Sequence, residues 1–220
     1  MQRQLSDYVL DLLLPSVEQA VSELPQLVAA VERQYGAIAA NGIGLFGFSA
    51  GAATAVHALL DGPTPIRAAV LAGSFPSLDA AVENFERGTR SYRDYLREHY
   101  DWLEDEMMTY SWSADSEAAR SHFDLSGRAA ELAEKSPQPA VLLAHGEQDE
   151  MLPVAEIRLL GDKLRGAYET RQAAERVAVN TFPHLAHHLD LMAENEPAVE
   201  KDLQLFREAV SAWYRRYLLQ

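Results

Sequence analysis

The chain has 220 residues, 48% of them hydrophobic and 24% charged, which suits a single domain with a substantial core. Its formal net charge of −14 disfavours binding to the phosphate backbone of nucleic acids. The absence of cysteine excludes disulfides, thiol catalysis and cysteine-ligated zinc. Residues 8–15 are too short for a membrane span and lack the basic start of a signal peptide. We therefore expect a cytoplasmic protein that binds neither nucleic acid nor membrane.

Short apolar segments alternate with helical patterns along the chain. The expected strands are 43–47, 68–72, 140–144 and 177–181. The expected helices are 16–35, 50–60, 154–176 and 197–219, with a kink or break at Pro25 and weak points at Gly161 and Gly166. This alternation predicts an α/β fold with a mostly parallel sheet and right-handed crossovers.

Residues 78–135 interrupt the alternation. They show helical segments rich in aromatic residues and no strand pattern. An insertion of this length between two strands is more typical of a helical cap than of a loop. We therefore expect one domain over residues 1–220, with 78–135 as a helical cap insertion.

The first candidate for chemistry is Ser49. It lies in the sequence GFSAG (47–51), between an expected strand and an alanine-rich helix. The G-x-S-x-G pattern in this setting is typical of a sharp turn that presents a nucleophilic serine. We expect Gly47 and Gly51 to let strand and helix pack closely, and the Ala50 N–H to face the developing oxyanion.

The second candidate is Asp149, in the sequence HGEQDEMLP (145–153) that directly follows an expected strand. Ligand-binding and catalytic groups gather at the carboxyl ends of strands in such sheets. A serine–histidine pair needs a carboxylate to orient the imidazole. Glu147 and Glu150 are alternatives on the same loop, and we expect His145 to close the loop through hydrogen bonds.

The third candidate is a histidine in FPHLAHH (182–188), after the last expected strand. His187 is the preferred general base and His188 the second choice. The chain order Ser49, Asp149, His187 is the order used by G-x-S-x-G hydrolases. The ligand number and spacing do not suit a closed zinc site, so we expect neither a metal nor another cofactor here.

These motifs resemble those of α/β-hydrolase-fold serine hydrolases, nearest to esterases and prolyl-oligopeptidase-like enzymes. GFSAG resembles their nucleophile elbow, HGEQDEMLP their acid loop HGxxDxxVP, and FPHLAHH their histidine loop. The resemblance covers residues 42–220 and implies a three-layer sandwich with a Ser49–His187–Asp149 triad. Phe48 and Trp112 are expected to contact the substrate, and the aromatic insertion to line its pocket.

The resemblance implies hydrolysis of small hydrophobic carboxylic esters through an acyl-enzyme. The alternatives are an amide hydrolase of the prolyl-oligopeptidase type and a catalytically impaired assembly module. Family members carry further strands and an HG-type oxyanion loop before the elbow, and neither is found before Gly42. We therefore expect a truncated sheet, weak activity, and self-association as a homodimer or larger through the exposed sheet edge or N-terminal helices.

Overall fold

The computed structural model describes residues 9–36, 42–88, 90–102, 110, 112–187 and 196–219. The elements, in chain order, are η1 (Val9–Leu13), α2 (Leu14–Tyr35), β1 (Ile43–Phe48), α3 (Ala50–Asp61), β2 (Ile66–Ala72), α4 (Leu78–Gly88), α5 (Arg90–His99), α6 (Ala114–Phe123), α7 (Ala129–Glu134), β3 (Ala140–Gly146), α8 (Val154–Glu169), η3 (Ala174–Arg176), β4 (Val177–Phe182) and α9 (Pro197–Leu218). The predicted α/β fold is confirmed, and each predicted strand is present.

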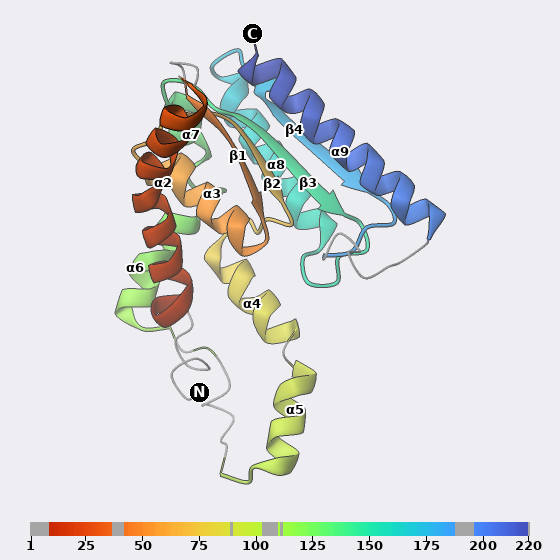
Figure 1. The fold of residues 1–220 in the computed structure, drawn as a ribbon. Helices are drawn as coiled ribbons and strands as arrows, with labels where there is room; N and C mark the ends of the chain where they lie inside the picture. Colours follow the sequence, from red (N-terminus) through yellow and green to blue (C-terminus); the bar gives the residue numbers. More distant parts are fainter. Residues whose placement is uncertain are drawn as a thin grey trace.

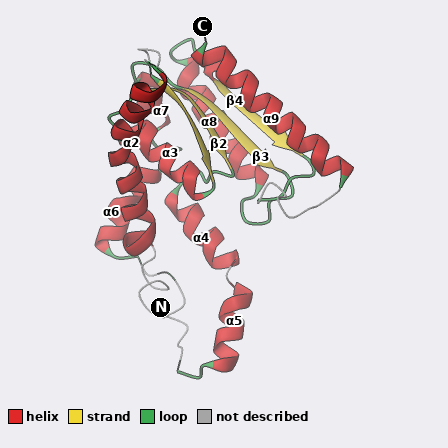
Figure 2. Cartoon of the chain, viewed as in Figure 1, coloured by secondary structure: helices red, strands yellow, loops and turns green. Residues whose placement is uncertain are grey.

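The sheet has four strands in the order β1–β2–β3–β4, and every neighbouring pair is parallel. Helices α3 and α8 cover one face, α9 covers the other, and α2 packs against α3 (Figures 1 and 2). Strands β2 and β3 are almost wholly buried because helices cover both of their faces. The carboxyl ends of all strands therefore meet at one edge of a well-packed sheet.

Two glycines allow helices to lie directly on the edge strands. A Cβ at Gly44 of β1 would stand 2.7 Å from the Leu218 side chain of α9. A Cβ at Gly161 of α8 would stand 2.1 Å from the Val179 side chain of β4. Helix α8 runs without a break through Gly161 and Gly166, so the predicted weak points do not interrupt it. Gly161 is instead a packing position.

The end of one helix differs from the prediction, and a second helix is not broken at its proline. The helix predicted over 154–176 ends at Glu169, because Gln172 adopts a left-handed φ of 57° that no α-helix continues through. A short 3₁₀ turn, η3, then leads into β4. Helix α2 is continuous through Pro25, so the helix does not end at that proline.

The insertion between β2 and β3 contains α4, α5, α6 and α7, and its described residues contain no strand. Helix α4 starts near the carboxyl ends of the strands, and α5 continues away from the sheet (Figure 1). Helix α6 packs against α3, and α7 packs against α8. Only the first part of this insertion therefore lies where it can border a site at the strand ends.

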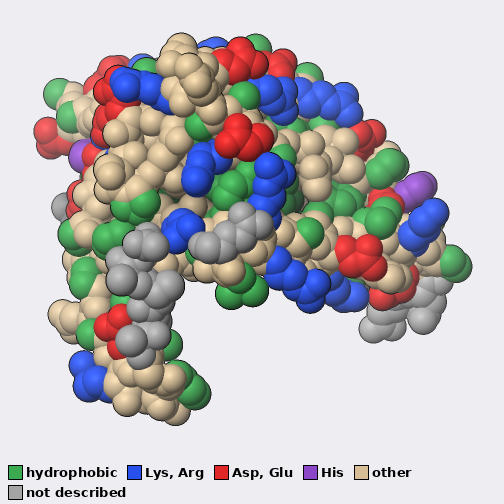
Figure 3. Space-filling view, turned by 90° about the horizontal axis from the view of Figure 1, so that it is seen from above, with side chains coloured by type: hydrophobic (Ala, Val, Ile, Leu, Met, Phe, Trp, Pro, Cys, Tyr) green, Lys and Arg blue, Asp and Glu red, His purple; other side chains and the backbone are tan. Residues whose placement is uncertain are grey.

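Basic and acidic side chains are mixed on the face of the molecule drawn in Figure 3. The face drawn in Figure 3 carries many Lys and Arg side chains beside acidic ones, although the chain has a net charge of −14. Within the described ranges, no helix combines the length and the apolar character that crossing a bilayer requires.

Strand β1 forms an edge of the sheet, since no described strand pairs with its outer side. Its Phe46 side chain is 50% exposed and touches the ring of Phe206 on α9. An apolar edge strand offers unpaired backbone groups to a second chain. We therefore propose that the chain self-associates through β1.

Sedimentation velocity tests this proposal. We expect the chain to sediment as a dimer or larger species, and Phe46→Lys to shift it toward monomer, because a charged edge residue opposes strand pairing. Leu159→Lys is the matched control, since Leu159 is 58% exposed on α8, away from β1, and should leave the association unchanged. A wild-type chain that stays monomeric at all concentrations would contradict the proposal.

Candidate active site

The three candidate residues lie on loops that follow different strands. Ser49 follows β1, Asp149 follows β3, and His187 follows β4. Because the strands are parallel neighbours, these loops lie at the same edge of the sheet. The structure brings the three side chains into direct contact.

Ser49 occupies a strained turn between β1 and α3. Its backbone has φ 52° and ψ −118°, a combination that a residue with a side chain rarely adopts. Its N–H is bonded to Ala72 O of β2 at 3.0 Å, which ties the turn to the sheet. A Cβ at Gly47 would stand 2.3 Å from Gly51 O, so only glycine fits under the first turn of α3. At Gly51 a Cβ would meet nothing within 4 Å, so the expected packing role applies to Gly47 alone.

His187 lies between Ser49 and Asp149. Its Nδ1 is 2.8 Å from Asp149 Oδ2, and its Nε2 is 3.0 Å from Ser49 Oγ. The carboxylate can only accept, so Nδ1 carries the imidazole proton and Nε2 offers a lone pair to the serine hydroxyl. The ring of His187 packs against Phe48, with 5.6 Å between ring centroids. Phe48 therefore supports the imidazole from β1.

Asp149 is buried and held by backbone donors. Its Oδ1 accepts hydrogen bonds from Met151 N at 2.9 Å and Leu152 N at 2.8 Å, which leaves Oδ2 for His187. Burial by itself raises the pKa of this carboxyl, but the hydrogen bonds from His187 and the Leu152 N–H outweigh it and lower the pKa below its ordinary value. Asp149 is therefore ionised near neutral pH.

The acid and histidine loops are held together by their backbones. Glu147 N donates to Phe182 O at 2.9 Å, and Gln148 N donates to Leu185 O at 3.0 Å. A Cβ at Gly146 would stand 2.1 Å from Leu185 O, so a glycine is required for this approach. These contacts fix the distance between Asp149 and His187.

The other candidate residues on these loops are not in contact with Ser49, as far as the structure describes them, and three of them have structural partners. His145 is buried and its Nε2 lies 2.8 Å from Leu152 O, in line with a loop-closing role. Glu147 binds Arg158 and Thr181, and His184 lies 3.1 Å from Asp202 of α9. Glu150 is exposed. His188 lies outside the described residues.

A small cavity opens beside Ser49 and His187. It has a volume of about 150 Å³ and is lined mainly by apolar side chains. The lining residues are Leu13, Ser49, Ala50, Gly73, Phe75, Ala81, Asn84, Met151, Leu152 and His187. Trp112 is not among them, because its ring packs against Tyr110 and under the guanidinium of Arg120.

Asn84 of α4 is a lining residue that sequence reasoning missed. It is 4% exposed, and its Oδ1 accepts a hydrogen bond from Arg87 at 2.8 Å. Its Nδ2 is buried and has no hydrogen-bond partner in the part of the chain that the structure describes. Buried donors are nearly always paired, and Asn84 lines the cavity, so we take its amide as a candidate contact for a bound ligand. The sequence offered one signal for Asn84, which is a polar residue at an apolar position of an amphipathic helix.

The depressed pKa of Asp149 predicts a pH-dependent contribution to stability. The folded-state pKa lies below the unfolded one, so this stabilisation is present above about pH 4 and is lost as the pH falls through the folded-state pKa. We expect Asp149→Asn to lower the free energy of unfolding by about 2 kcal/mol at pH 7, and by progressively less at acidic pH.

Urea unfolding of wild type and variant between pH 3 and pH 7 measures this difference. Asp162→Asn is the control, since Asp162 is an exposed residue in a surface ion pair and its removal should change stability little at any pH. A difference for Asp149→Asn that stays constant across this pH range would contradict the prediction.

Comparison with known proteins agrees with this architecture. Residues 18–212 match the prolyl oligopeptidase family (Peptidase_S9). No curated protein matches the chain significantly. The esterase domain of a Rhodothermus marinus protein aligns over 90% of this chain with a TM-score of 0.51 and 15% identity. A Pyrococcus furiosus esterase aligns over 90% with a TM-score of 0.55 and 14% identity.

The Pyrococcus horikoshii acylaminoacyl peptidase aligns over 93% of the chain, with a TM-score of 0.55 and 14% identity. The chain spans 69% of the Rhodothermus domain, 62% of the Pyrococcus esterase and 28% of the peptidase. At such identities the structures establish the fold, while the family match extends over most of the chain. The chain belongs to the prolyl oligopeptidase family of serine hydrolases and has the α/β-hydrolase fold.

Proposed function

We propose that the chain hydrolyses small hydrophobic carboxylic esters through a covalent acyl-enzyme. The proposal rests on the continuous hydrogen-bonded series from Asp149 through His187 to Ser49. Asp149 Oδ2 lies 2.8 Å from His187 Nδ1, and His187 Nε2 lies 3.0 Å from Ser49 Oγ. This is the geometry that a serine nucleophile, a general base and an orienting carboxylate require. Membership of the prolyl oligopeptidase family supports the reaction class.

In the proposed reaction, Ser49 Oγ attacks the ester carbonyl while its proton passes to His187 Nε2. The tetrahedral intermediate collapses as the bond to the alcohol oxygen breaks, and His187 returns the proton to that oxygen. Water then attacks the acyl carbonyl and gives its proton to His187. The bond to Ser49 Oγ breaks, His187 returns the proton to Oγ, and the acid is released. Asp149 stays ionised throughout and stabilises the imidazolium.

The oxyanion requires donors beside Ser49. Ala50 lines the cavity at the N-terminus of α3, where backbone N–H groups have no partner within the helix and the helix dipole favours negative charge. We assign the first donor to the Ala50 N–H.

We assign the second donor to Asn84 Nδ2. The hydrogen bond from Arg87 to Oδ1 fixes the orientation of the amide, so the unpaired group is the NH₂. Asn84 lines the same cavity as Ser49. A side-chain amide can thus take the place of the loop donor that family members supply before the elbow.

The cavity supports a small acyl group. Its volume of about 150 Å³ is below the range of about 300–1,000 Å³ typical of drug-sized ligands. Leu13, Phe75 and Met151 make its lining largely apolar. We therefore expect short acyl chains to be accepted in preference to long fatty acyl chains.

Amide hydrolysis is the second candidate, and the family match favours it. An amine is a poorer leaving group than an alcohol, so amides need stronger stabilisation of the tetrahedral intermediate. With one donor from the backbone and one from a side chain, we expect p-nitrophenyl butyrate to react faster than an aminoacyl-prolyl amide.

Labelling with a serine-directed fluorophosphonate tests the nucleophile. We expect the probe to modify Ser49 alone, and Ser49→Ala to abolish labelling and to lower kcat for p-nitrophenyl butyrate by about 10⁴-fold or more. Mass spectrometry of the labelled peptide and a spectrophotometric assay provide the measurements.

Ser121→Ala is the control, because Ser121 is an exposed helical serine bonded to Ala118 O. It should label and turn over like wild type. Absence of labelling in folded wild-type protein would contradict the proposal and favour a catalytically impaired assembly module.

Asn84→Leu tests the second donor. We expect kcat to fall by about 10²–10³-fold with little change in KM, because the amide acts on the transition state. We expect the thermal midpoint to stay equal or to rise, since the change removes an unpaired buried donor. A merely structural Asn84 would instead show lowered stability and unchanged kcat.

A further inference from the structure

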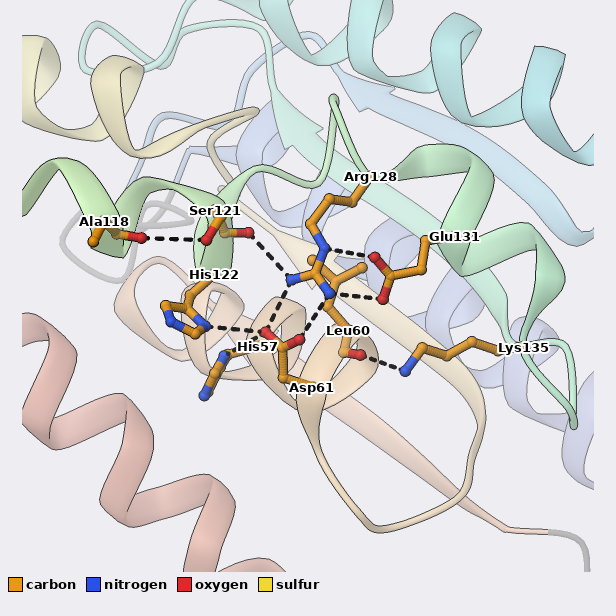
Figure 4. Close-up of polar contacts among 9 residues, drawn as sticks. All are labelled: His57, Leu60, Asp61, Ala118, Ser121, His122, Arg128, Glu131 and Lys135. Carbon is orange, nitrogen blue, oxygen red and sulfur yellow. Dashed lines mark hydrogen bonds and ion pairs between the residues drawn. The ribbon is translucent and has the colours of Figure 1, made fainter.

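A second polar cluster lies at the other end of the elbow helix. His57 and Asp61 are one turn apart on α3, and His122 comes from α6. One ligand atom of each residue lies within 4.8 Å of the others (Figure 4). Asp61 ends α3, which places the cluster about 16 Å along the helix from Ser49. The proposed reaction does not use it.

The spacing of these atoms suits a shared cation. His57 Nδ1 and His122 Nδ1 each lie 3.2 Å from Asp61 Oδ2. Tetrahedral zinc with ligands at about 2.0–2.2 Å separates neighbouring ligand atoms by about 3.3 Å. Ligands at i and i+4 on one helix face the same side. Two of the three separations between ligand atoms therefore match those of a tetrahedral site, and the third is within 4.8 Å.

Hydrogen bonding leaves one of the ligand atoms unexplained. His57 is 7% exposed, and its side chain is 9% exposed. Nδ1 lies 3.2 Å from Asp61 Oδ2, close enough for an ion pair when His57 is protonated. Within the described residues, however, no well-directed hydrogen bond reaches this buried nitrogen. Buried polar atoms of this kind are rare without a partner, and a cation on the nitrogen lone pair would supply one.

Arg128 also binds Asp61, and its position is compatible with a cation. It donates to Oδ1 at 2.7 Å and to Oδ2 at 2.9 Å, so Oδ2 is shared between the guanidinium and the two imidazoles (Figure 4). Glu131 binds the same guanidinium at 2.6 Å and 2.8 Å. With neutral histidines, the charges of Asp61, Glu131 and Arg128 sum to −1. Hydrogen-bond donors to a ligating carboxylate are a regular feature of metal sites.

We propose that His57, Asp61 and His122 bind one divalent cation of the zinc class in a structural site. Imidazole and carboxylate ligands suit Zn²⁺ among the first-row metals. The side chains of Asp61 and His122 are 29% and 40% exposed, so solvent water can complete the coordination. The cation joins α6 to the helix that positions Ser49, and so stabilises the elbow from its far end.

Zinc binding by tag-free protein, first stripped with a chelator, tests the proposal. We expect calorimetry with ZnCl₂ to show one equivalent bound, and saturating zinc to raise the thermal midpoint by about 5 °C or more. His122→Gln should weaken binding at least tenfold, because it removes a half-exposed ligand while the core residues stay in place. Co²⁺ should give the visible absorption of a tetrahedral site in wild type, and this absorption should be lost in His122→Gln.

His99→Gln is the matched control, since His99 is an exposed histidine on α5 and should leave zinc binding unchanged. The proposal is overturned if wild type does not bind one equivalent of zinc. It is also overturned if His122→Gln binds zinc like wild type, which would place the ion elsewhere and leave this cluster as an ion-pair network. Phosphonate labelling of Ser49 is scored separately, so neither result depends on the other.

Discussion

The turn at Ser49 is the constraint on which the site depends. Its φ of 52° occurs where β1 turns into α3. The bond from Ser49 N to Ala72 O holds the turn, and so does the close packing at Gly47, where a Cβ would stand 2.3 Å from Gly51 O. This strain points the hydroxyl out of the sheet edge and directs the N-terminus of α3 at the same place. The proposed nucleophile and its proposed first oxyanion donor are thus products of one backbone conformation.

The rest of the site is built on parallel pairing. Because β3 and β4 are neighbours in register, their loops leave the sheet side by side, and Gly146 lets Leu185 O approach closely enough for the loops to bond. His187 is then confined between Asp149 and Ser49 by three groups: the carboxylate, the serine hydroxyl and the ring of Phe48. A site of this kind needs few residues because the sheet has already fixed the loops.

The sequence was informative where local chemistry leaves few choices, and less so where tertiary packing decides. The strands, the insertion and the contact of Ser49, Asp149 and His187 followed from apolar runs and three short motifs. The end of α8 at Glu169 was missed, because Gln172 takes a left-handed conformation without the usual glycine. The lining position of Asn84 and the cluster of His57, Asp61 and His122 were missed, because their surroundings depend on how α4 and α6 pack. Trp112 was expected to contact the substrate because it is an aromatic residue of the insertion, but its ring packs against Arg120.

The central claim is that Ser49 carries an acyl group during turnover. Intact-protein mass spectrometry after mixing with p-nitrophenyl acetate and quenching in acid within milliseconds tests it most directly, because acid stops deacylation. The account predicts that protein with an intact His187 transiently gains the mass of one acetyl group. Proteolysis should locate this group on the peptide that contains Ser49. Turnover with no acyl-protein at any time, or with the acyl group on another residue, would contradict it.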